Sequence, residues 1–481
     1  MVSNDTRKWT AVGTVTFMML QAIFTSAVVL FVLLMPKSVT SWKILLTMDN
    51  IAVIIGIAAS WYLLRAIVTS SYNPHSNTDP SYGLKTIFLW IFGIGLIAEV
   101  FLYLLIDLEC LFFKGSVDVH FIDPTFLRIS TIACFVLQLV AITKGKNRSI
   151  VFTWKEQISI YLIIFLNMDF WIKGTVEDIN NLFLKEAFIE SYNITNKTRD
   201  LVSRACFWES EFQNALKDLY PYTLPMQFEF QMLATVLLLG LKVTKNRYIA
   251  HSQNGIRNAF CTPGQRKYAL GSVIIGIFAA IIFICFRLLM KFYFNNQDDG
   301  HVIMNLYLVS HTVFNTFNTI LTVAAFKILK SRWNVRTQYR NVSTNEYVIV
   351  ITGTFPILYY ATLISFSNST GEFIIRFVSS VSAIVSIHYQ TVYVLCMNCY
   401  RTDSDVSHQD RCILTACLVS LGIGNMSYWV VNTFIELRNL QDWIVEVNRD
   451  WYLIRRLTDP LCTFYRFHIS MEFYSQLKKL S

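Results

Sequence analysis

The sequence predicts an all-α polytopic membrane protein with twelve transmembrane helices in two parallel six-helix halves. Three observations predict this fold: an apolar composition, a series of segments long enough to cross a bilayer, and an internal repeat of polar residues. Of the 481 residues, 54% are hydrophobic and only 15% are charged, whereas a soluble protein has about 25% charged residues. This composition excludes a disordered chain, and the absence of long basic runs argues against binding of nucleic acid.

A helix that spans a membrane needs about 20 mostly apolar residues, because the hydrocarbon core is about 30 Å thick. Eleven segments clearly meet this requirement, and a twelfth at 452–474 is more polar. The predicted spans are 11–35, 44–67, 86–110, 126–142, 156–172, 224–241, 269–290, 302–328, 346–366, 374–397, 412–434 and 452–474.

These spans predict the organisation of the whole chain. Each half contains six helices, and a short linker joins the halves. The expected parts are a cytoplasmic N-terminus at 1–10, an N-terminal half at 11–242, a cytoplasmic linker at 243–268, a C-terminal half at 269–475 and a cytoplasmic C-terminus at 476–481.

The orientation follows from the Lys and Arg residues beside the spans, which favour the cytoplasmic side. The connectors after the fourth, sixth and eighth spans are the richest in these residues, so both termini are expected in the cytoplasm. Asn193, Asn196 and Asn368 begin Asn-x-Ser/Thr sequons on the outer side, where glycans can be added. Cys110 and Cys206 are expected on that side too, so a disulfide between them is one alternative.

Two of the spans carry the same polar pattern. Asn167 is followed by Trp171 and then by Thr175 at four-residue steps, which places the three on one helix face. The same three residue types recur 258 positions later, in the eleventh span, at Asn425, Trp429 and Thr433.

Two further pairs recur in the same order along the chain. Gln138 and Gln390 are separated by 252 positions, and Pro225 and Pro460 by 235. With six helices in each half, both halves enter the membrane from the same side, so the repeat is parallel. Packing remains an alternative for these amides, because Asn and Gln also join membrane helices by hydrogen bonds.

Ionisable residues within the spans suggest a function, because a charge in the hydrocarbon core costs about 2.5–3.5 kcal/mol on insertion scales. Such groups usually face protein or a wet cavity, where carboxyl, imidazole and amide groups relay protons together with water. Packing of a neutral histidine and solvation of a charge near a span end are the alternatives. The residues concerned are Asp49, Glu99, Asp169, Glu229, His311, His388, Glu436 and His468.

Several motifs of other protein classes are absent from the sequence. It contains no phosphate-binding loop, no dinucleotide fingerprint and no His-Glu-x-x-His zinc motif. Cys396 and Cys399 form a lone CxxC without a second pair. We therefore expect no enzyme activity, no cofactor and no metal. A potassium-type selectivity filter is also missing.

Five segments between the third span and the C-terminus carry distinctive motifs. They are Phe92-Gly93-Ile94-Gly95, Leu224-Pro225-Met226-Gln227-Phe228-Glu229-Phe230-Gln231-Met232, Gln390-Thr391-Val392-Tyr393-Val394, Asn425 through Trp429 to Thr433-Phe434, and Pro460-Leu461 with Phe464-Tyr465-Arg466-Phe467-His468-Ile469-Ser470. In these five segments the chain resembles the otopetrin family of proton channels. The resemblance is strongest in the last segment, which is close to the family's Pro-Leu-x-x-Phe-Tyr-Arg-Phe-His-Ser ending.

The resemblance implies a homodimer in the plasma membrane whose partners are protons and membrane lipids, with a sterol-like lipid at the subunit centre. It also implies that acid activates the proton conductance. Gln231 stands where the family pattern has serine, and Asp169 has no counterpart in that pattern. These departures indicate a divergent, invertebrate-like member.

The function predicted from the sequence is a proton-selective ion channel that extracellular acid opens and that carries protons into the cell. A proton-coupled secondary transporter of a small solute is the alternative, and a receptor without transport is a third reading. The expected proton pathway comprises Glu99, Gln138, Asn167, Asp169, Glu229, His388, Gln390, Asn425, Glu436, Arg466 and His468.

Overall fold

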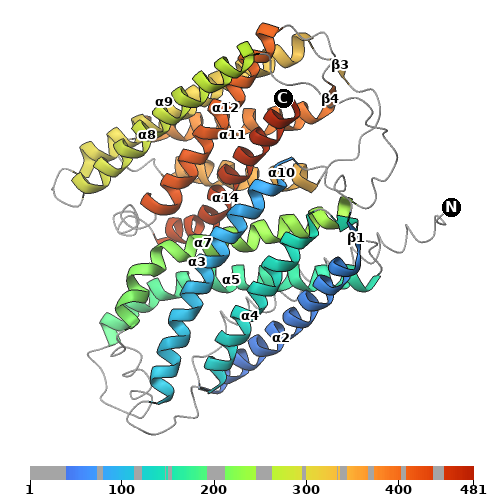
Figure 1. Ribbon diagram of the computed structural model, residues 1–481. Helices are drawn as coiled ribbons and strands as arrows, with labels where there is room; N and C mark the ends of the chain where they lie inside the picture. Colours follow the sequence, from blue (N-terminus) through green and yellow to red (C-terminus); the bar gives the residue numbers. More distant parts are fainter. Residues whose placement is uncertain are drawn as a thin grey trace. The chain divides into compact units, whose positions relative to one another are not determined.

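A computed structural model describes thirteen stretches of the chain, and α-helices make up most of them (Figure 1). Eleven α-helices lie within these stretches. The described residues are 39–72, 80–112, 122–146, 148–149, 154–191, 212–244, 263–294, 300–332, 334–335, 344–366, 373–401, 408–436 and 449–480.

The helices are long enough to cross a membrane, and a few very short strands lie beside some of their ends. In the first part of the chain the helices are α2 (Val39–Thr69), α3 (Tyr82–Leu111), α4 (Ile122–Gly145), α5 (Trp154–Ser191) and α7 (Phe212–Thr244). In the second part they are α8 (Pro263–Phe294), α9 (Gly300–Arg332), α10 (Thr344–Phe366), α11 (Phe373–Cys399), α12 (His408–Val431) and α14 (Arg449–Leu480). A π-helix, η5 (Asn432–Glu436), directly follows α12.

Two small β-ladders are the only β-structure in the described stretches. The strand β1 (Ser71–Tyr72) pairs with β2 (Arg148–Ser149). The strand β3 (Asn334–Val335) pairs in antiparallel fashion with β4 (Tyr400–Arg401). Each strand has two residues, so these ladders connect helix ends and form no separate layer.

Nine helical segments of the described residues are long and apolar enough to span a bilayer. This finding confirms a polytopic helical protein, while the number twelve stays a prediction. The nine segments are Leu46–Thr69, Tyr82–Leu111, Ile122–Gly145, Trp154–Thr175, Phe212–Leu241, Asn305–Leu329, Asn345–Ser365, Phe373–Met397 and Gln409–Ile435.

The other three predicted spans have different outcomes. The first, at 11–35, lies outside the described residues. The seventh and the twelfth fall within α8 and α14, which are helical but are not among the nine apolar segments. The polarity of α14 has a structural reason, because its polar residues Arg466, His468 and Glu472 are buried inside the protein.

Helix α7 is longer than the sequence predicts. It begins at Phe212, twelve positions before the expected start of the sixth span. The added segment is amphipathic, with Leu216 buried and Asp218 exposed. Its polar face lowers its mean hydropathy, so a search for apolar runs does not detect it. Pro225 therefore lies inside the helix and not at its beginning.

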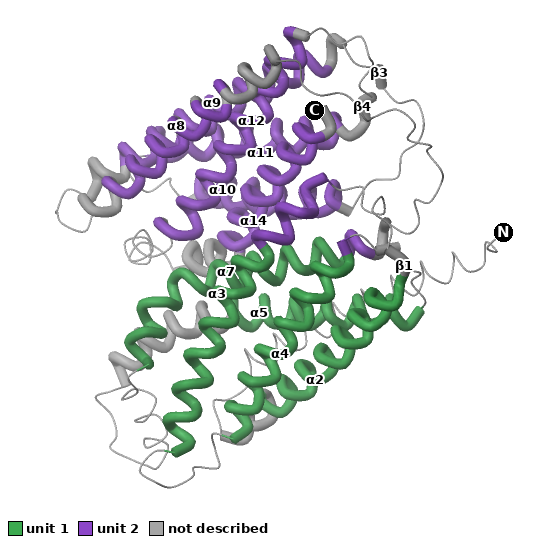
Figure 2. The backbone as a smooth tube through the Cα atoms, viewed as in Figure 1, with its two compact units in different colours: residues 1–71, 89–145, 150–238 green, residues 72–88, 146–149, 239–481 purple. Residues whose placement is uncertain are grey.

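The chain divides into two compact units (Figure 2). Unit 1 comprises residues 1–71, 89–145 and 150–238, and unit 2 comprises 72–88, 146–149 and 239–481. The beginning of α3 thus packs with unit 2, although it precedes most of unit 1 in the sequence. The continuous halves expected from the sequence stay a prediction.

Unit 1 is built around the packing of α2 on α4 and α5. Gly56 of α2 makes this approach close, because a Cβ atom there would collide with Leu166 of α5 and meet Sγ of Cys134 on α4 at 3.3 Å. Val53 lies with these two residues in one buried apolar cluster. Small residues allow such close approaches between membrane helices.

Unit 2 has α12 near its middle, in contact with α8, α9 and α14. Helix α11 packs on α9 and α10, and α10 packs on α14. The buried apolar cluster of this unit draws on α9, α10, α11, α12 and α14 and includes Leu329, Ile387, Leu418 and Tyr465.

The outer faces of the helices are apolar, whereas polar side chains lie inside. On α8, Ile274 is 59% exposed and Phe278 is 66% exposed. Inside unit 2, by contrast, Gln390, Asn425 and Asn315 are completely buried. This distribution fits helices that face lipid, because hydrocarbon solvates apolar side chains and polar groups need partners within the protein.

Candidate functional site

Three polar side chains from three helices of unit 2 form a hydrogen-bonded triad. Asn425 of α12 donates through Nδ2 to Oε1 of Gln390 on α11 at 2.9 Å. Arg466 of α14 donates through Nη1 to Oδ1 of Asn425 at 3.0 Å. All three side chains are buried. The triad brings together three residues that the sequence assigns to the proton pathway.

The triad continues to a fourth helix through Arg466. The second guanidinium nitrogen, Nη2, donates to Oδ1 of Asn315 on α9 at 3.1 Å. The amide nitrogen of Asn315 in turn donates to the backbone oxygen of His311, one turn earlier, at 2.9 Å. The guanidinium group is planar, so its two nitrogens hold Asn425 and Asn315 in fixed positions.

His311 is the centre of a cluster of hydroxyl groups. Its Nδ1 lies 2.9 Å from Oγ of Ser379, and its Nε2 lies 3.0 Å from Oη of Tyr360. Nε2 is also within hydrogen-bond distance of Oη of Tyr428. The two tyrosine oxygens are 3.2 Å apart. The ring of Tyr428 connects this cluster to the triad, because the guanidinium carbon of Arg466 lies 4.6 Å from the ring centre.

The buried guanidinium of Arg466 is thus surrounded by neutral partners, two amide oxygens and one aromatic face. A guanidinium group carries only donors and keeps its charge at all relevant pH values. It therefore fixes the amides around it but cannot accept a proton from a neighbour.

In unit 1 three buried amide side chains lie on α4, α5 and α7. Gln138 donates through Nε2 to Sγ of Cys134 at 3.5 Å. Asn167 and Gln231 are completely buried. Five side-chain atoms of these amides have no hydrogen-bond partner among the residues that the structure describes: Oε1 of Gln138, both polar atoms of Asn167 and both of Gln231.

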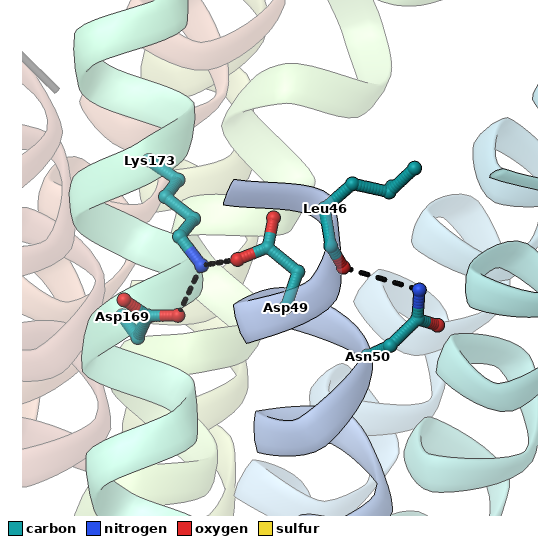
Figure 3. A network of polar contacts seen from close by, with 5 residues as sticks. All are labelled: Leu46, Asp49, Asn50, Asp169 and Lys173. Atoms are coloured by element: carbon teal, nitrogen blue, oxygen red, sulfur yellow. Dashed lines mark hydrogen bonds and ion pairs between the residues drawn. The ribbon is translucent and has the colours of Figure 1, made fainter. Parts of the chain in front are cut away.

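A second polar cluster of unit 1 joins α2 to α5 (Figure 3). Lys173 donates through Nζ to Oδ2 of Asp169 at 2.6 Å, and it also forms an ion pair with Asp49 of α2. The three side chains are between 9% and 20% exposed, so most of their surface is removed from solvent. Asn50 turns to its own helix and donates to the backbone oxygen of Leu46 at 3.1 Å.

Two carboxyl groups of the expected pathway are buried in unit 1. Glu99 on α3 is 4% exposed and Glu229 on α7 is 2% exposed. The two helices approach each other closely near these residues, because a Cβ atom on Gly95 would collide with Sδ of Met226. Both carboxyl groups thus lie in the interior of the protein, on helices that are long enough to span a membrane.

The three remaining residues of the predicted pathway are His388, His468 and Glu436. His388 is exposed on α11, and its ring lies edge-on to that of Tyr389. His468 is buried, with its ring stacked on Phe464 at 5.6 Å between centroids. Glu436 is in the π-helix η5, but its side chain lies outside the described residues.

The three sequons and one of the two cysteines of the alternative disulfide between Cys110 and Cys206 lie outside the part of the chain that the structure describes. Asn193, Asn196 and Asn368 lie outside the described residues, as does Cys206. Cys110 at the end of α3 is disulfide-bonded. This state fits an oxidising environment at that end of the helix.

Several residues of the site are not in the set chosen from the sequence. Lys173 lies one position beyond the predicted end of the fifth span, where a lysine is typical of the membrane interface. Its four-residue spacing from Asp169 is the signal that indicates an ion pair on one helix face. Asn315, Tyr360, Ser379 and Tyr428 are also missing from that set, and each of them contacts a partner on another helix.

These features define a multi-pass helical membrane protein whose interior carries amide, carboxyl, imidazole and guanidinium groups. A family model for otopetrins matches residues 176–467, which is more than half of the 481 residues. The chain belongs to the otopetrin family, a family of proton channels and not of enzymes. A comparison with curated proteins finds no match.

Proposed function

We propose that this protein is a proton-selective channel of the plasma membrane that extracellular acid opens and that carries protons into the cell. The observation that carries the proposal is that Glu99, Asp169 and Glu229 are buried in the protein and lie on helices long enough to span a membrane. The chain also belongs to a family of proton channels. Burying ionisable groups at membrane depth is costly, so they usually mark an ion or proton route.

The chemistry of the buried groups suits protons better than larger ions. A carboxyl group can bind a proton and release it again, and buried amides can orient water molecules that pass protons on. Larger ions need several oxygen ligands to replace their hydration shell, as in filters made of backbone carbonyls. The sequence offers no such filter.

The assembly and orientation belong to the same proposal. Both termini lie in the cytoplasm, because Lys and Arg gather in the connectors on that side. The protein acts as a homodimer whose partners are membrane lipids, with a sterol-like lipid at the subunit centre. The apolar outer face of α8 is consistent with such surroundings.

Whole-cell recording together with imaging of intracellular pH tests this function. External pH is stepped from neutral into the range where histidine titrates. The proposal predicts an inward current whose reversal potential follows the proton gradient, together with acidification of the cytosol. Cells without the chain are the control. No current in cells with confirmed surface expression contradicts the proposal.

A proton-coupled transporter is the second candidate, and the cluster around Lys173 favours it. A lysine between Asp49 and Asp169 exchanges partners when a carboxylate binds a proton, which is a step that coupled transporters need. The same recording separates the two functions. A channel passes current with no solute present, whereas a transporter passes current only when its solute is added.

A further inference from the structure

Each unit contains one glycine at which three helices pack closely, and the neighbours of the two glycines match the sequence repeat. A Cβ atom on Gly93 of α3 would meet Leu139 of α4 at 2.8 Å and Phe230 of α7 at 3.2 Å. A Cβ atom on Gly353 of α10 would meet Thr391 of α11 at 3.2 Å and Tyr465 of α14 at 3.1 Å.

The neighbours of the two glycines are related by the offsets already present in the sequence. Thr391 follows Leu139 by 252 positions, which is the offset of Gln390 from Gln138. Tyr465 follows Phe230 by 235 positions, which is the offset of Pro460 from Pro225. At this same offset, Gln231 corresponds to Arg466.

The glutamines themselves confirm this register. Gln138 donates to Cys134, four residues earlier, and Gln390 donates to Ser386, also four residues earlier, at 3.0 Å. Cys134 and Ser386 are again 252 positions apart. The counterparts of Gln390, Asn425 and Arg466 in unit 1 are therefore Gln138, Asn167 and Gln231.

The helices that carry the three amides of unit 1 converge at this level. The ring of Phe135 on α4 lies 5.3 Å from the ring of Phe170 on α5 and 5.4 Å from that of Phe230 on α7. Gln138 and Asn167 are each three positions from one of these rings, and Gln231 is adjacent to the third.

The two sets of three residues differ in their hydrogen bonds. In unit 2 the triad is closed, because Arg466 and Asn425 bind their neighbours directly. In unit 1 five amide atoms of the matching set are buried without a partner among the described residues. Buried amide atoms require hydrogen bonds, and a water molecule supplies them where protein groups do not.

We propose that unit 1 holds a water site between Gln138, Asn167 and Gln231, and that protons cross the protein through this site. The second clause rests on the proposed channel function. Water both donates and accepts hydrogen bonds, so a proton that binds on one side can leave from the other. In unit 2 the guanidinium of Arg466 takes the matching place, repels a proton and accepts none, so this half does not conduct.

Cysteine labelling tests the water site without any proton current. Cys134 is a natural probe beside Gln138, and the substitution Ser386→Cys places the same probe beside Gln390. Methyl methanethiosulfonate reacts with the thiolate, whose formation needs water, so we expect Cys134 to react at least about threefold faster than the thiol introduced by Ser386→Cys. The protein is purified in lipid nanodiscs, and mass spectrometry follows each site.

Two results decide the labelling test. A rate at Cys134 that exceeds the rate at the engineered thiol by the expected factor supports the water site. A smaller difference overturns it. Cys417, which is free and buried in unit 2, serves as an internal reference in both proteins.

The route of the protons is tested by two substitutions at Gln231. Gln231→Met removes the amide at nearly constant volume, and Gln231→Arg introduces the group found in unit 2. We expect both to reduce proton flux into proteoliposomes and to slow the labelling of Cys134. Gln409→Met, on the exposed beginning of α12, is the control and should change neither.

The outcomes separate this inference from the proposed function. Unchanged flux in a folded Gln231→Met protein, as judged by its elution volume, overturns the route through unit 1. A wild-type protein that carries no protons contradicts the channel function, yet the labelling rates still decide whether the water site exists.

Discussion

Lys173 donates to Asp169 one turn earlier on α5 and also pairs with Asp49 on α2, so a single ammonium group joins two helices of unit 1. The bond to Asp169 is 2.6 Å long. The two carboxylates share one cation, and the ammonium group between them reduces the repulsion between their negative charges. This arrangement makes the contact between α2 and α5 depend on charge as well as on apolar packing.

Replacing Lys173 with Met is expected to destabilise the protein by about 1–3 kcal/mol, because two carboxylates then lose their cation in a mostly buried place. The thermal midpoint in one fixed detergent, followed by tryptophan fluorescence, measures the change. Lys155→Met, at an exposed position of the same helix, is the control. Adding Asp49→Asn should restore part of the loss, and a double variant no more stable than Lys173→Met would contradict the ion pair.

Replacing His311 with Phe is expected to cost about 1–3 kcal/mol, because three hydroxyl groups lose the nitrogens of the buried ring that they contact. The same substitution at His388, which is exposed, should change stability by no more than about 0.5 kcal/mol. Thermal unfolding of the two variants in parallel makes the comparison. Equal effects would mean that the hydroxyl cluster contributes nothing specific.

Replacing Gly93 with Ala is expected to destabilise unit 1 by about 1–2 kcal/mol, because the new methyl group would overlap Leu139 and press on Phe230. Gly240→Ala is the matched control, since a Cβ atom there meets nothing within 4 Å. That control should gain about 0.5–1 kcal/mol from the higher helix propensity of alanine. Denaturation curves that rank the variants in the opposite order would exclude the close packing of α3 on α4 and α7.

Replacing Glu229 with Gln is expected to reduce the proton current by about tenfold, which corresponds to about 1.4 kcal/mol in the barrier. The reason is that glutamine keeps the shape of the side chain but cannot bind and release a proton. Current is measured in whole cells and normalised to surface expression. Asp218→Asn, at an exposed position of the same helix, should leave the current unchanged. An undiminished current in Glu229→Gln would remove this carboxyl from the pathway.

Local sequence patterns predicted part of the site because helical periodicity places residues at fixed spacings on one face. Asn167 and Asn425 were recognisable from the Asn-Trp-Thr steps, and both are buried as expected for an inward face. The last motif likewise indicated Arg466. Its two hydrogen-bond partners come from α12 and α9, however, and no spacing along α14 reveals them.

The sequence by itself determined the helical membrane class, most of the spans and the family, because these depend on composition, on segment length and on local motifs. The tertiary structure alone decided which polar groups meet. His311 lies in a cluster drawn from α9, α10, α11 and α12, whereas His388 faces outward. Both histidines occupy apolar helices, so composition cannot distinguish them; only the packing of neighbouring helices determines which face is buried.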